Sequence, residues 1–550
     1  MPSLRDIENR VARLRRRRAR AEQVVADIDN EVRVLEDELR RTREANATTI
    51  VPNVTDLAPP PRQPDASRWP LNLAARSGLT GGNPLVTIVD SMVLAFRPAF
   101  SRQATFTWFV VVVWGFLLRG DGDGVTSTVR CFGLAASEYH NLLGFFHSTA
   151  FDVNTLCRCW CRVVFAVLPR VTVAGKPVYV SDAIKVGKAG HKMPAVKTLH
   201  QESEDNTKPE FIRGHFWASF SLLVGVVSSP FALPLRFQLQ DGIKLSPSDH
   251  TSLPTKMANL IILAAAVPGY VVVDNFYAGI KFLCRLVAAG FHVISRLRKN
   301  AVAYEPAPIV LKRGRGRPRK YGAKVVLSKL FRNRSLFRCT SLPIYTDIKN
   351  IAFHSRDLFW NGMMVRIVLT IFPDGARCIL VCTDCALEPE AIIQAYGFRF
   401  KIEVQFKEMV HVILGFAYHF WMMAMPRTGS RPRNFYLHRK SADFRRLVFR
   451  KIEAYERFVN IAAIALGILQ TLALVGRDHI WSHFPVWFRT LRTRTHPSEH
   501  VARITLQAAL QQEISGPHHE SSLLARILPV HQAAHSQPHP LRLVPPLNQP

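Results

Sequence analysis

The sequence predicts an α/β core flanked by helical regions, and three observations carry this prediction. Apolar runs with strand character, KPVYV at 176–180 and GYVVV at 269–273, alternate with helical patterns between residues 171 and 300. A third run, RCILVC at 377–382, precedes a helical stretch that starts near residue 389. Helical patterns without strands fill the regions on either side. Strands interleaved with helices are typical of an α/β fold.

Residues 1–44 carry a heptad pattern that predicts one long coiled-coil helix. Arg18 interrupts the apolar seam, and the basic run RLRRRRAR at 13–20 weakens it. A dimerising coiled coil is the favoured interpretation, and a solvated basic helix is the alternative. The apolar positions of the seam are Leu4, Ile7, Val11, Leu14, Ala21, Val25, Ile28, Val32, Leu35 and Leu39.

The remaining segments follow from composition. A Pro-rich stretch at 45–83 indicates a linker. The helical pattern at 84–170 predicts an N-terminal helical domain that could bind DNA. Packing in the core is the simpler explanation for most of its aromatic residues. The catalytic core is expected at 171–440, with an insertion at about 300–375 that includes a basic loop. A helical C-terminal region is expected at 441–516, followed by a His- and Pro-rich disordered tail at 517–550.

The charge of the chain points to a polyanionic partner. Lys and Arg number 72 against 41 Asp and Glu, a formal net charge of +31. Nucleic acid is the natural partner, although ribosomal and membrane-surface proteins share this balance. The apolar runs at 105–118 and 260–273 are shorter than the roughly 20 residues that cross a bilayer. With no signal peptide recognisable, we expect a cytoplasmic, nucleoid-associated protein and no membrane partner.

Three acidic residues are placed where strands or a helix would direct them to one site. Asp182 and Asp274 close apolar strands, and Glu403 lies on the helix after residue 389. Carboxylates so arranged can hold two divalent cations for in-line phosphoryl transfer. Asp384, which ends the 377–382 strand, is a rival ligand or a cap of the following turn. Glu408 is a second rival, but it lies off the helix face that carries Glu403.

The helix around Glu403 places four further residues on the same face. An Arg one turn before the carboxylate and a Lys one turn after it keep the carboxylate ionised, while the cations are free to contact phosphate. An ordinary ladder of ion pairs on a solvated helix is the structural alternative. The face consists of Tyr396, Arg399, Glu403, Lys407 and Val410.

Several long motifs recur in an order that resembles bacterial insertion-sequence transposases with a DDE catalytic triad on a ribonuclease-H-like fold. The resemblance covers roughly residues 84–440 and excludes the coiled coil and the tail. Its motifs are SDAIKVGKAGHKMPAVKTLHQESEDNTKPEFIRGH at 181–215, VVVDNFYA, RGRPRKYG, TDCALEPEAIIQAYGFRFKIEVQFKE and YHFWMM.

The resemblance implies that Asp182, Asp274 and Glu403 are the catalytic residues and bind two Mg²⁺ ions, with Mn²⁺ as a substitute. Tyr396, Arg399 and Glu403 match the Y-x2-R-x3-E signature, and the resemblance implies that Glu403 binds metal while Tyr396 and Arg399 contact DNA. The lysine of the family pattern, seven residues beyond the glutamate, is absent because Val410 stands there. Lys407, one turn earlier, is expected to take the phosphate-contacting role.

Two basic loops are the further candidates for DNA contact. Lys185, Lys188 and Lys192 follow the first aspartate, and a solvated loop is the alternative interpretation. RGRP at 315–318 is the core of an AT-hook, whose extended Arg-Gly-Arg fits the narrow minor groove. In that loop Arg315 and Arg317 would insert into the groove, while Arg319 and Lys320 would contact phosphates.

Together these patterns predict an insertion-sequence transposase, a DNA endonuclease and strand transferase that acts on double-stranded DNA at transposon ends and at the target. Because two ends must be joined, we expect a homodimer or a higher synaptic assembly. One alternative is a DNA-binding regulator or transposase remnant without catalysis, and another is a structural membrane-associated protein. The terminal repeats, the target preference and the excision route are not encoded in these patterns.

Overall fold

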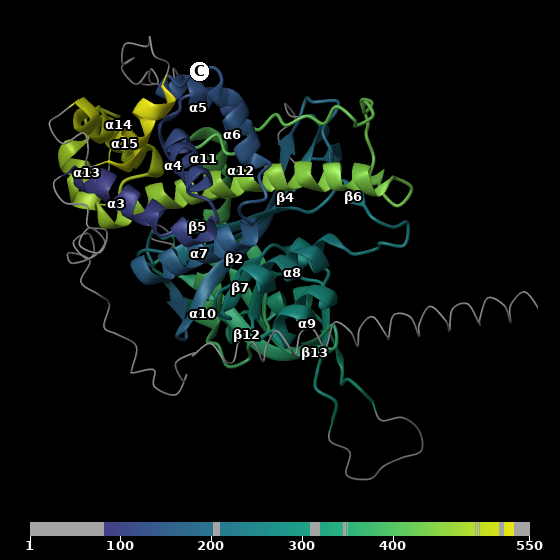
Figure 1. Cartoon of the computed structure of the whole chain (residues 1–550). Coiled ribbons are helices and arrows are strands. Elements are labelled where there is room, and N and C mark those ends of the chain that lie inside the picture. The colour runs from purple at the N-terminus through teal and green to yellow at the C-terminus, as the bar shows by residue number, and fades with distance from the viewer. Residues whose placement is uncertain are drawn as a thin grey trace, which may run out of the picture. The chain divides into compact units, whose positions relative to one another are not determined.

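The computed structural model describes residues 82–201, 209–308, 319–344, 348, 350–489, 491, 493, 495–515 and 522–532. The predicted coiled coil at 1–44, nearly all of the predicted linker, and Arg315 and Arg317 lie outside these residues. Within the described part the chain is mixed α/β, with helices around one large sheet (Figure 1).

The centre of the sheet combines an antiparallel and a parallel half. Strand β2 pairs antiparallel with β4, which pairs antiparallel with β5. On its other edge β2 runs parallel to β7, and β7 runs parallel to β8. Helices α8 and α9 provide the crossover connections that parallel strands require. These elements are β2 (Lys176–Gly187), β4 (Phe211–Val224), β5 (Phe231–Leu239), α8 (Leu253–Ala264), β7 (Tyr270–Val273), α9 (Ile280–Ala288) and β8 (His292–Arg296).

Residues beyond β8 extend the same sheet with antiparallel strands. β14 pairs with β8, and β13 pairs with both β14 and β12. The β12–β13 hairpin turns at Asn361 and Gly362, whose φ angles of 48° and 91° suit the two-residue turn that Asn-Gly favours. The strands are β9 (Val302–Tyr304), β10 (Lys324–Val326), β11 (Arg338–Thr340), β12 (Ile351–Trp360), β13 (Met363–Ile371) and β14 (Arg377–Cys382).

Short elements complete the described strands and turns. β1 pairs with β2, β3 pairs with β4, and β6 pairs with β15 in a separate two-stranded sheet. They are β1 (Thr172–Val173), β3 (Lys197–His200), β6 (Ile243–Lys244), β15 (Phe435–Tyr436), and the 3₁₀ turns Arg97–Ala99, Asn275–Tyr277, Leu327–Arg332 and Arg334–Leu336.

Helices before and after the sheet pack together, although they are far apart along the chain. The apolar run at 105–118 forms most of a buried helix, α4. Several helices begin at side-chain caps, such as Asp152 before α7 and Ser441 before α12. The helices are α3 (Pro84–Leu94), α4 (Gln103–Leu118), α5 (Val125–Phe132), α6 (Glu138–Phe146), α7 (Val153–Val167), α12 (Ala442–Val475), α13 (Arg477–His483), α14 (Glu499–Ser515) and α15 (Leu523–His531).

Helix α15 corrects one prediction. The tail from residue 517 was expected to be disordered, yet Leu523–His531 is helical and packs on α4. Leu524 and Leu528 are buried, and the carboxylate of Asp90 accepts a hydrogen bond from the Leu523 amide at 2.7 Å. This segment carries apolar residues that the composition of the whole tail conceals.

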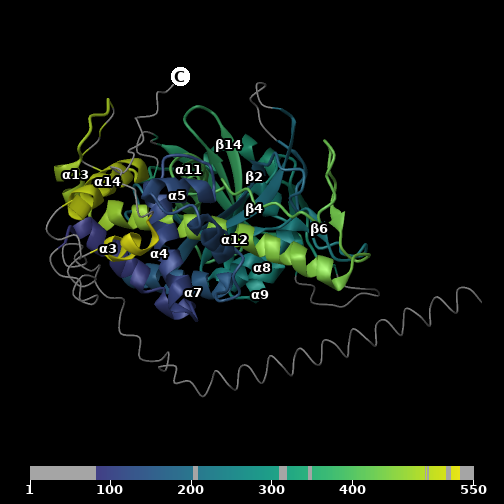
Figure 2. The same ribbon diagram turned by 45° about the horizontal axis from the view of Figure 1, so that its top comes forward.

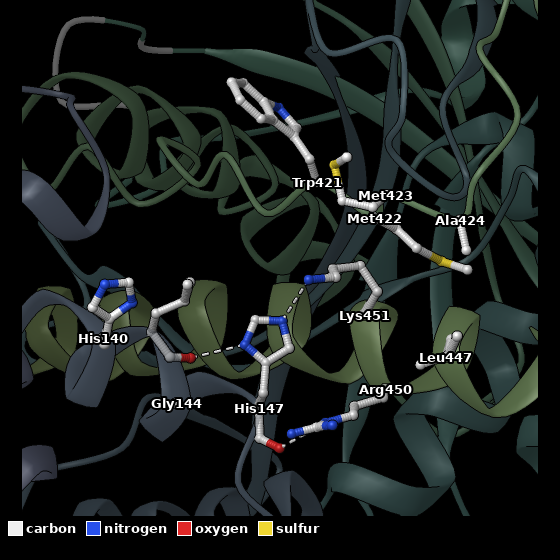
Figure 3. A pocket seen from close by; sticks show the side chains of 11 residues that line it. His140, Gly144, His147, Trp421, Met422, Met423, Ala424, Leu447, Arg450 and Lys451 are labelled. Atoms are coloured by element: carbon white, nitrogen blue, oxygen red, sulfur yellow. Dashed lines mark hydrogen bonds between the residues drawn. The ribbon is translucent and has the colours of Figure 1, made fainter.

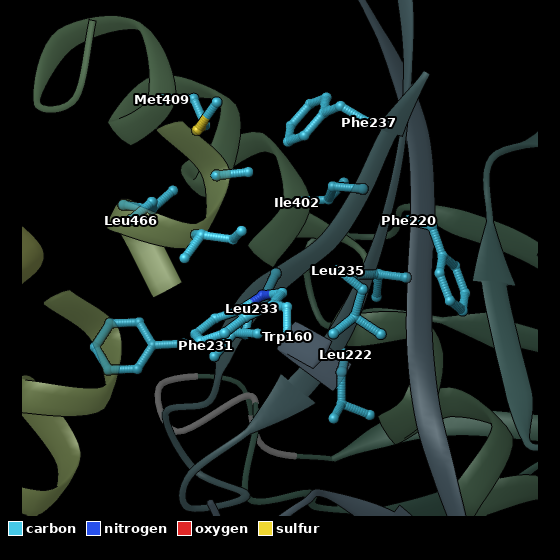
Figure 4. Packing of buried hydrophobic residues seen from close by; sticks show 14 of the residues in the cluster. Trp160, Phe220, Leu222, Phe231, Leu233, Leu235, Phe237, Ile402, Met409 and Leu466 are labelled. Atoms are coloured by element: carbon cyan, nitrogen blue, oxygen red, sulfur yellow. The ribbon is translucent and has the colours of Figure 1, made fainter. Parts of the chain in front are cut away.

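Helix α12 is the longest described helix, as Figure 1 and Figure 2 show, and nearly all of its residues from Ala454 to Ala473 are buried. It packs on β5 and on α4, α7 and α14. Figure 4 shows its Leu466 near β5 side chains and near Met409 of α11 (Phe400–His411). Of all described helices, α12 alone is long and apolar enough to cross a membrane, but 89% of its most apolar window is buried inside the protein. That burial is what a core helix of a globular protein requires.

Candidate active site

The register of the parallel strands brings the first two predicted acids together. Ser181 of β2 lies opposite Val273 of β7, so the next residues, Asp182 and Asp274, leave the paired region side by side. Asp274 follows the end of β7, as predicted. Asp182 does not end its strand, because β2 continues to Gly187 and pairs there with β4 only. The edge of the parallel pairing, rather than the end of β2, therefore sets the position of Asp182.

The third acid reaches the same site from a helix that packs on the sheet. Glu403 lies in the first turn of α11 (Phe400–His411), which contacts β2 and β5. The single helix expected from residue 389 is divided, since α10 spans Pro389–Gly397 and residues 398 and 399 form a tighter turn. There the Arg399 amide donates to the Tyr396 carbonyl three residues earlier, at 3.0 Å.

Arg399 connects two of the three carboxylates. Its Nη1 donates to Oδ2 of Asp182 at 2.9 Å, and its Nη2 donates to Oε1 of Glu403. Asp182 and Arg399 are each about one-fifth exposed, and Glu403 is about half exposed. The arginine expected to contact DNA is therefore engaged with the acids in this structure.

The electrostatic coupling extends to Asp274. Burial raises the pKa of Asp182 from 3.8 to about 6, against the lowering effect of Arg399 and of a hydrogen bond from the Ala183 amide. The charges of Asp274 and Glu403 raise it further. Burial also raises the pKa of Tyr277, and Asp182 and Asp274 both add to that rise. The three carboxylates therefore share one electrostatic environment.

The raised pKa of Asp182 predicts that the stability of the metal-free protein depends on pH. Because the Asp182 carboxyl titrates near 3.8 when unfolded and near 6 when folded, folding takes up a proton between these values, and its ionisation costs stability as pH rises through that window. Asp182→Asn should therefore stabilise the protein at pH 7.5 by about 1 to 3 kcal/mol. Urea unfolding in EDTA should show this gain shrinking toward zero near pH 4. An equal difference at both pH values would exclude Asp182 as its source.

The donor set suits a hard divalent cation. Carboxylate oxygens are the ligands that Mg²⁺ prefers, and a cationic guanidinium already bridges Asp182 and Glu403. In this conformation, no three His, Cys, Asp or Glu side chains of the described part of the chain lie close enough together to hold a metal ion. Arg399 thus neutralises the carboxylates in the arrangement seen here.

One predicted DNA contact is corrected by burial. Lys188 is 8% exposed and its Nζ donates to the carbonyl oxygens of Phe416 and Tyr418. The same Nζ lies 3.6 Å from the centre of the Tyr418 ring, and burial lowers the pKa of Lys188 to about 7. A lysine so enclosed fixes the loop after β2 against the segment after α11 and has no free face for a phosphate.

The other predicted DNA contacts are more accessible. Lys407 is exposed on α11, and Arg319 and Lys320 are exposed after the undescribed residues 309–318. Lys185 and Lys192 are partly exposed, and each donates to a backbone carbonyl, of His200 and of Met423 respectively. Tyr396 is half-buried at the end of α10, where burial raises its pKa.

The rival acids occupy different places. Asp384 accepts from the Tyr270 hydroxyl at 2.7 Å and from the Ala386 amide at 2.9 Å, which fits a cap of the strand-to-helix turn. Burial raises the pKa of Glu408 to about 7, and the charge of Glu499 on α14 adds to the rise. Glu408 therefore faces the C-terminal helices rather than Asp182.

Sequence reasoning missed a basic segment, residues 427–450, and the cavity beside it. From residue 427 to residue 450 the chain carries one acid, Asp443, which pairs with Arg446. Its density of arginines was a signal available in the sequence. The exposed cations of this basic segment are Arg427, Arg431, Arg433, Arg439, Lys440, Arg445, Arg446 and Arg450.

Comparisons with known proteins give one family match and one distant structural likeness. Residues 95–334 match the family model of the DDE superfamily endonucleases, which confirms the DDE resemblance and includes Asp182 and Asp274. Glu403 lies beyond the matched range. A solved structure described as a piggyBac transposase synaptic complex with hairpin DNA shares 11% identity with this chain, covers 84% of each chain and has a TM-score of 0.32. No curated protein matches the sequence.

Proposed function

We propose that this chain is an insertion-sequence DDE transposase that cuts DNA strands at the ends of its element and joins the freed 3′ ends to target DNA. The observation that carries the proposal is a pair of links between acids that are far apart in the sequence. Asp182 and Asp274 are adjacent through the parallel register, and Arg399 links Glu403 to Asp182. The match to the DDE superfamily endonucleases supports the same reaction class.

The proposed core is ribonuclease-H-like. Strands β2, β4 and β5 form an antiparallel meander, and β7 and β8 continue it in parallel with helices between them. The strands from β9 to β13, together with the basic residues at 309–318, are the proposed insertion between β8 and β14. These limits follow the expected insertion at about 300–375 and leave β14 and α11 to complete the core.

Asp182, Asp274 and Glu403 are the residues that would hold two Mg²⁺ ions, or Mn²⁺ in their place. Such ions supply Lewis acidity and a water or hydroxyl nucleophile that is active at neutral pH. Arg399 keeps Asp182 and Glu403 oriented toward each other in the metal-free protein. Glu403 lies in the first turn of α11, where the partial positive charge of the helix N-terminus attracts a carboxylate.

The charge distribution supports double-stranded DNA as the substrate. The net charge of +31 favours salt-sensitive binding of a polyanion, and Lys407, Arg319 and Lys320 are exposed cations. Joining two element ends requires a homodimer or a higher synaptic assembly. A cytoplasmic, nucleoid-associated location follows from the proposed substrate.

Cleavage of the element's own ends tests the proposal. DNA flanking the coding sequence should carry inverted repeats, and the purified full chain should nick duplexes containing them in Mg²⁺ or Mn²⁺. Chelation by EDTA should lower the nicking rate to background, and restored Mg²⁺ should recover it. A duplex of scrambled sequence is the substrate control.

The competing candidate is a DNA-binding regulator without catalysis. It predicts tight binding of the same duplexes and no nicking in either metal. That result would refute the proposed transposase while leaving the charge-based prediction of DNA binding in place.

A further inference from the structure

A cavity of about 540 Å³ opens between α6, the residues after α11 and the N-terminal half of α12 (Figure 3). Its walls combine apolar side chains with cationic ones, and none of them belongs to the carboxylate site. The lining includes His147, Trp421, Met423, Arg450 and Lys451.

The cationic wall is organised by a buried histidine. His147 accepts a hydrogen bond from Lys451 Nζ at its Nε2, at 2.8 Å, and its Nδ1 lies 2.8 Å from the Leu143 carbonyl oxygen. Arg450 Nε donates to the His147 carbonyl oxygen at 3.2 Å. Burial lowers the pKa of His147 to about 4, so the ring is neutral at pH 7 and acts as the acceptor for Lys451. One residue therefore fixes two cations at the cavity.

Lys451 retains hydrogen-bonding capacity toward the cavity. An ammonium group has three donors, and among the described residues its recorded hydrogen-bond acceptor is His147 alone. Burial lowers the pKa of Lys451 to about 8, and the charge of Arg450 contributes. A bound anion would supply the missing acceptor and favour the charged form.

The opposite wall presents an aromatic and a thioether side chain to solvent. Trp421 is 62% exposed and Met423 is 83% exposed, a large apolar surface for two side chains of one short segment. The backbone there is fixed, because the Met422 amide donates to the Lys192 carbonyl at 3.0 Å and Lys192 Nζ donates to the Met423 carbonyl. Trp421 is thus exposed on an anchored segment.

The surroundings of the cavity are strongly positive. The basic segment at 427–450 contributes eight exposed Lys or Arg residues, and Arg450 belongs to both the segment and the cavity. An exposed aromatic ring beside a line of cations is the combination that binds single-stranded nucleic acid, with bases stacked on the ring and phosphates on the cations.

We propose that this cavity is a subsite for one unpaired nucleotide of single-stranded DNA, with the base against Trp421 and Met423 and the phosphate at Arg450 and Lys451. The inference rests on the proposed DNA substrate and goes beyond the carboxylate site. β2 runs five residues from Asp182 to Gly187, about 17 Å, toward the loop that anchors Met422 and Met423. Through Lys192, the loop after β2 therefore links the strand that carries Asp182 to the segment that carries Trp421 and Met423.

Binding to matched DNA substrates tests the subsite without requiring cleavage. Fluorescence anisotropy in EDTA would compare a blunt duplex with the same duplex carrying a single-stranded tail. Trp421→Leu should weaken binding of the tailed duplex about tenfold and leave blunt-duplex affinity unchanged, and Trp421→Phe should restore most of the loss. Lys451→Met should lower the salt dependence of tail binding by about 0.7 in log–log slope, whereas Trp421→Leu should not change that slope.

Two exposed residues away from the cavity provide matched controls. Trp487 is 78% exposed and Lys329 is exposed on another element, so Trp487→Leu and Lys329→Met should leave tail binding as in the wild type. Equal losses on tailed and blunt DNA, or no loss for Trp421→Leu, would overturn the subsite. So would a polyglutamate peptide that displaces the tail and loses affinity in Trp421→Leu, because the cavity would then bind acidic peptides.

The outcomes separate this inference from the proposed function. Tail-specific loss in Trp421→Leu, in a protein that never nicks DNA in Mg²⁺, would leave the subsite standing and remove the transposase. If the protein nicks element ends but Trp421→Leu binds tailed DNA as tightly as the wild type, the transposase would stand and the subsite would be removed.

Discussion

Amide replacement of Asp182, Asp274 or Glu403 should lower the rate of metal-dependent strand cleavage by on the order of 10³-fold, equivalent to about 4 kcal/mol of transition-state stabilisation. Each carboxylate carries charge that an amide of the same shape lacks. Affinity for end DNA in EDTA should stay within about threefold of the wild type, since phosphate contacts, not these acids, dominate binding. Single-turnover cleavage of end DNA and anisotropy titrations would measure the two quantities.

Matched variants make this prediction specific. Asp374→Asn, in the exposed turn between β13 and β14, and Glu408→Gln, on the α14-facing side of α11, should cleave at the wild-type rate. Because residues of one catalytic unit are not additive, Asp182→Asn combined with Glu403→Gln should be little slower than either single variant. Normal cleavage by any one of the three amide variants would remove that residue from the site. Loss of cleavage in Glu408→Gln would indicate Glu408 as the third ligand in place of Glu403.

Replacing Gly467 by alanine should destabilise the fold by about 3 kcal/mol, although alanine is the better helix former. A Cβ built at this position of α12 would lie 2.3 Å from Cζ2 of Trp160 on α7. The ring cannot retreat easily, because it is fully buried and its Nε1 donates to the Pro234 carbonyl of β5 at 2.8 Å. Urea unfolding followed by circular dichroism would measure the change.

Gly144 provides the control for this second prediction. It lies inside α6, and a Cβ added there meets nothing within 4 Å. Gly144→Ala should therefore match the wild type or gain up to about 1 kcal/mol from helix propensity. If Gly467→Ala proved as stable as Gly144→Ala, the close packing of α12 on α7 and β5 would be wrong.

The candidate site was predictable to the extent that local patterns defined it. Apolar runs before Asp182 and Asp274 predicted strands, and the structure places both acids at one edge of the parallel pairing. The β12–β13 turn at Asn361 and Gly362, which was not among the predictions, likewise follows local φ preferences. These features depend on side-chain alternation and backbone φ preferences, which neighbouring residues determine.

Other predictions failed because distant contacts override local ones. Lys188 looked like a basic loop residue, but carbonyl oxygens more than two hundred residues away enclose its ammonium group. The DNA contact of Arg399 stays a prediction, but its bond to Asp182, 217 residues distant in the sequence, could not be read from local patterns. The expected single helix carrying Glu403 is divided near Arg399, where the chain turns onto β2 and β5.

The sequence by itself determined the α/β class and the basic character of the protein, because these follow from composition and short-range periodicity; the three acids remain its prediction for the site. Only the tertiary structure decided that Arg399 bridges two of the acids, that Lys188 is internal and that Trp421 shares a cavity with Lys451. These outcomes depend on which surfaces the sheet and α12 bring together. Burial and Coulomb attraction act between atoms close in space, and separation along the chain does not encode that closeness.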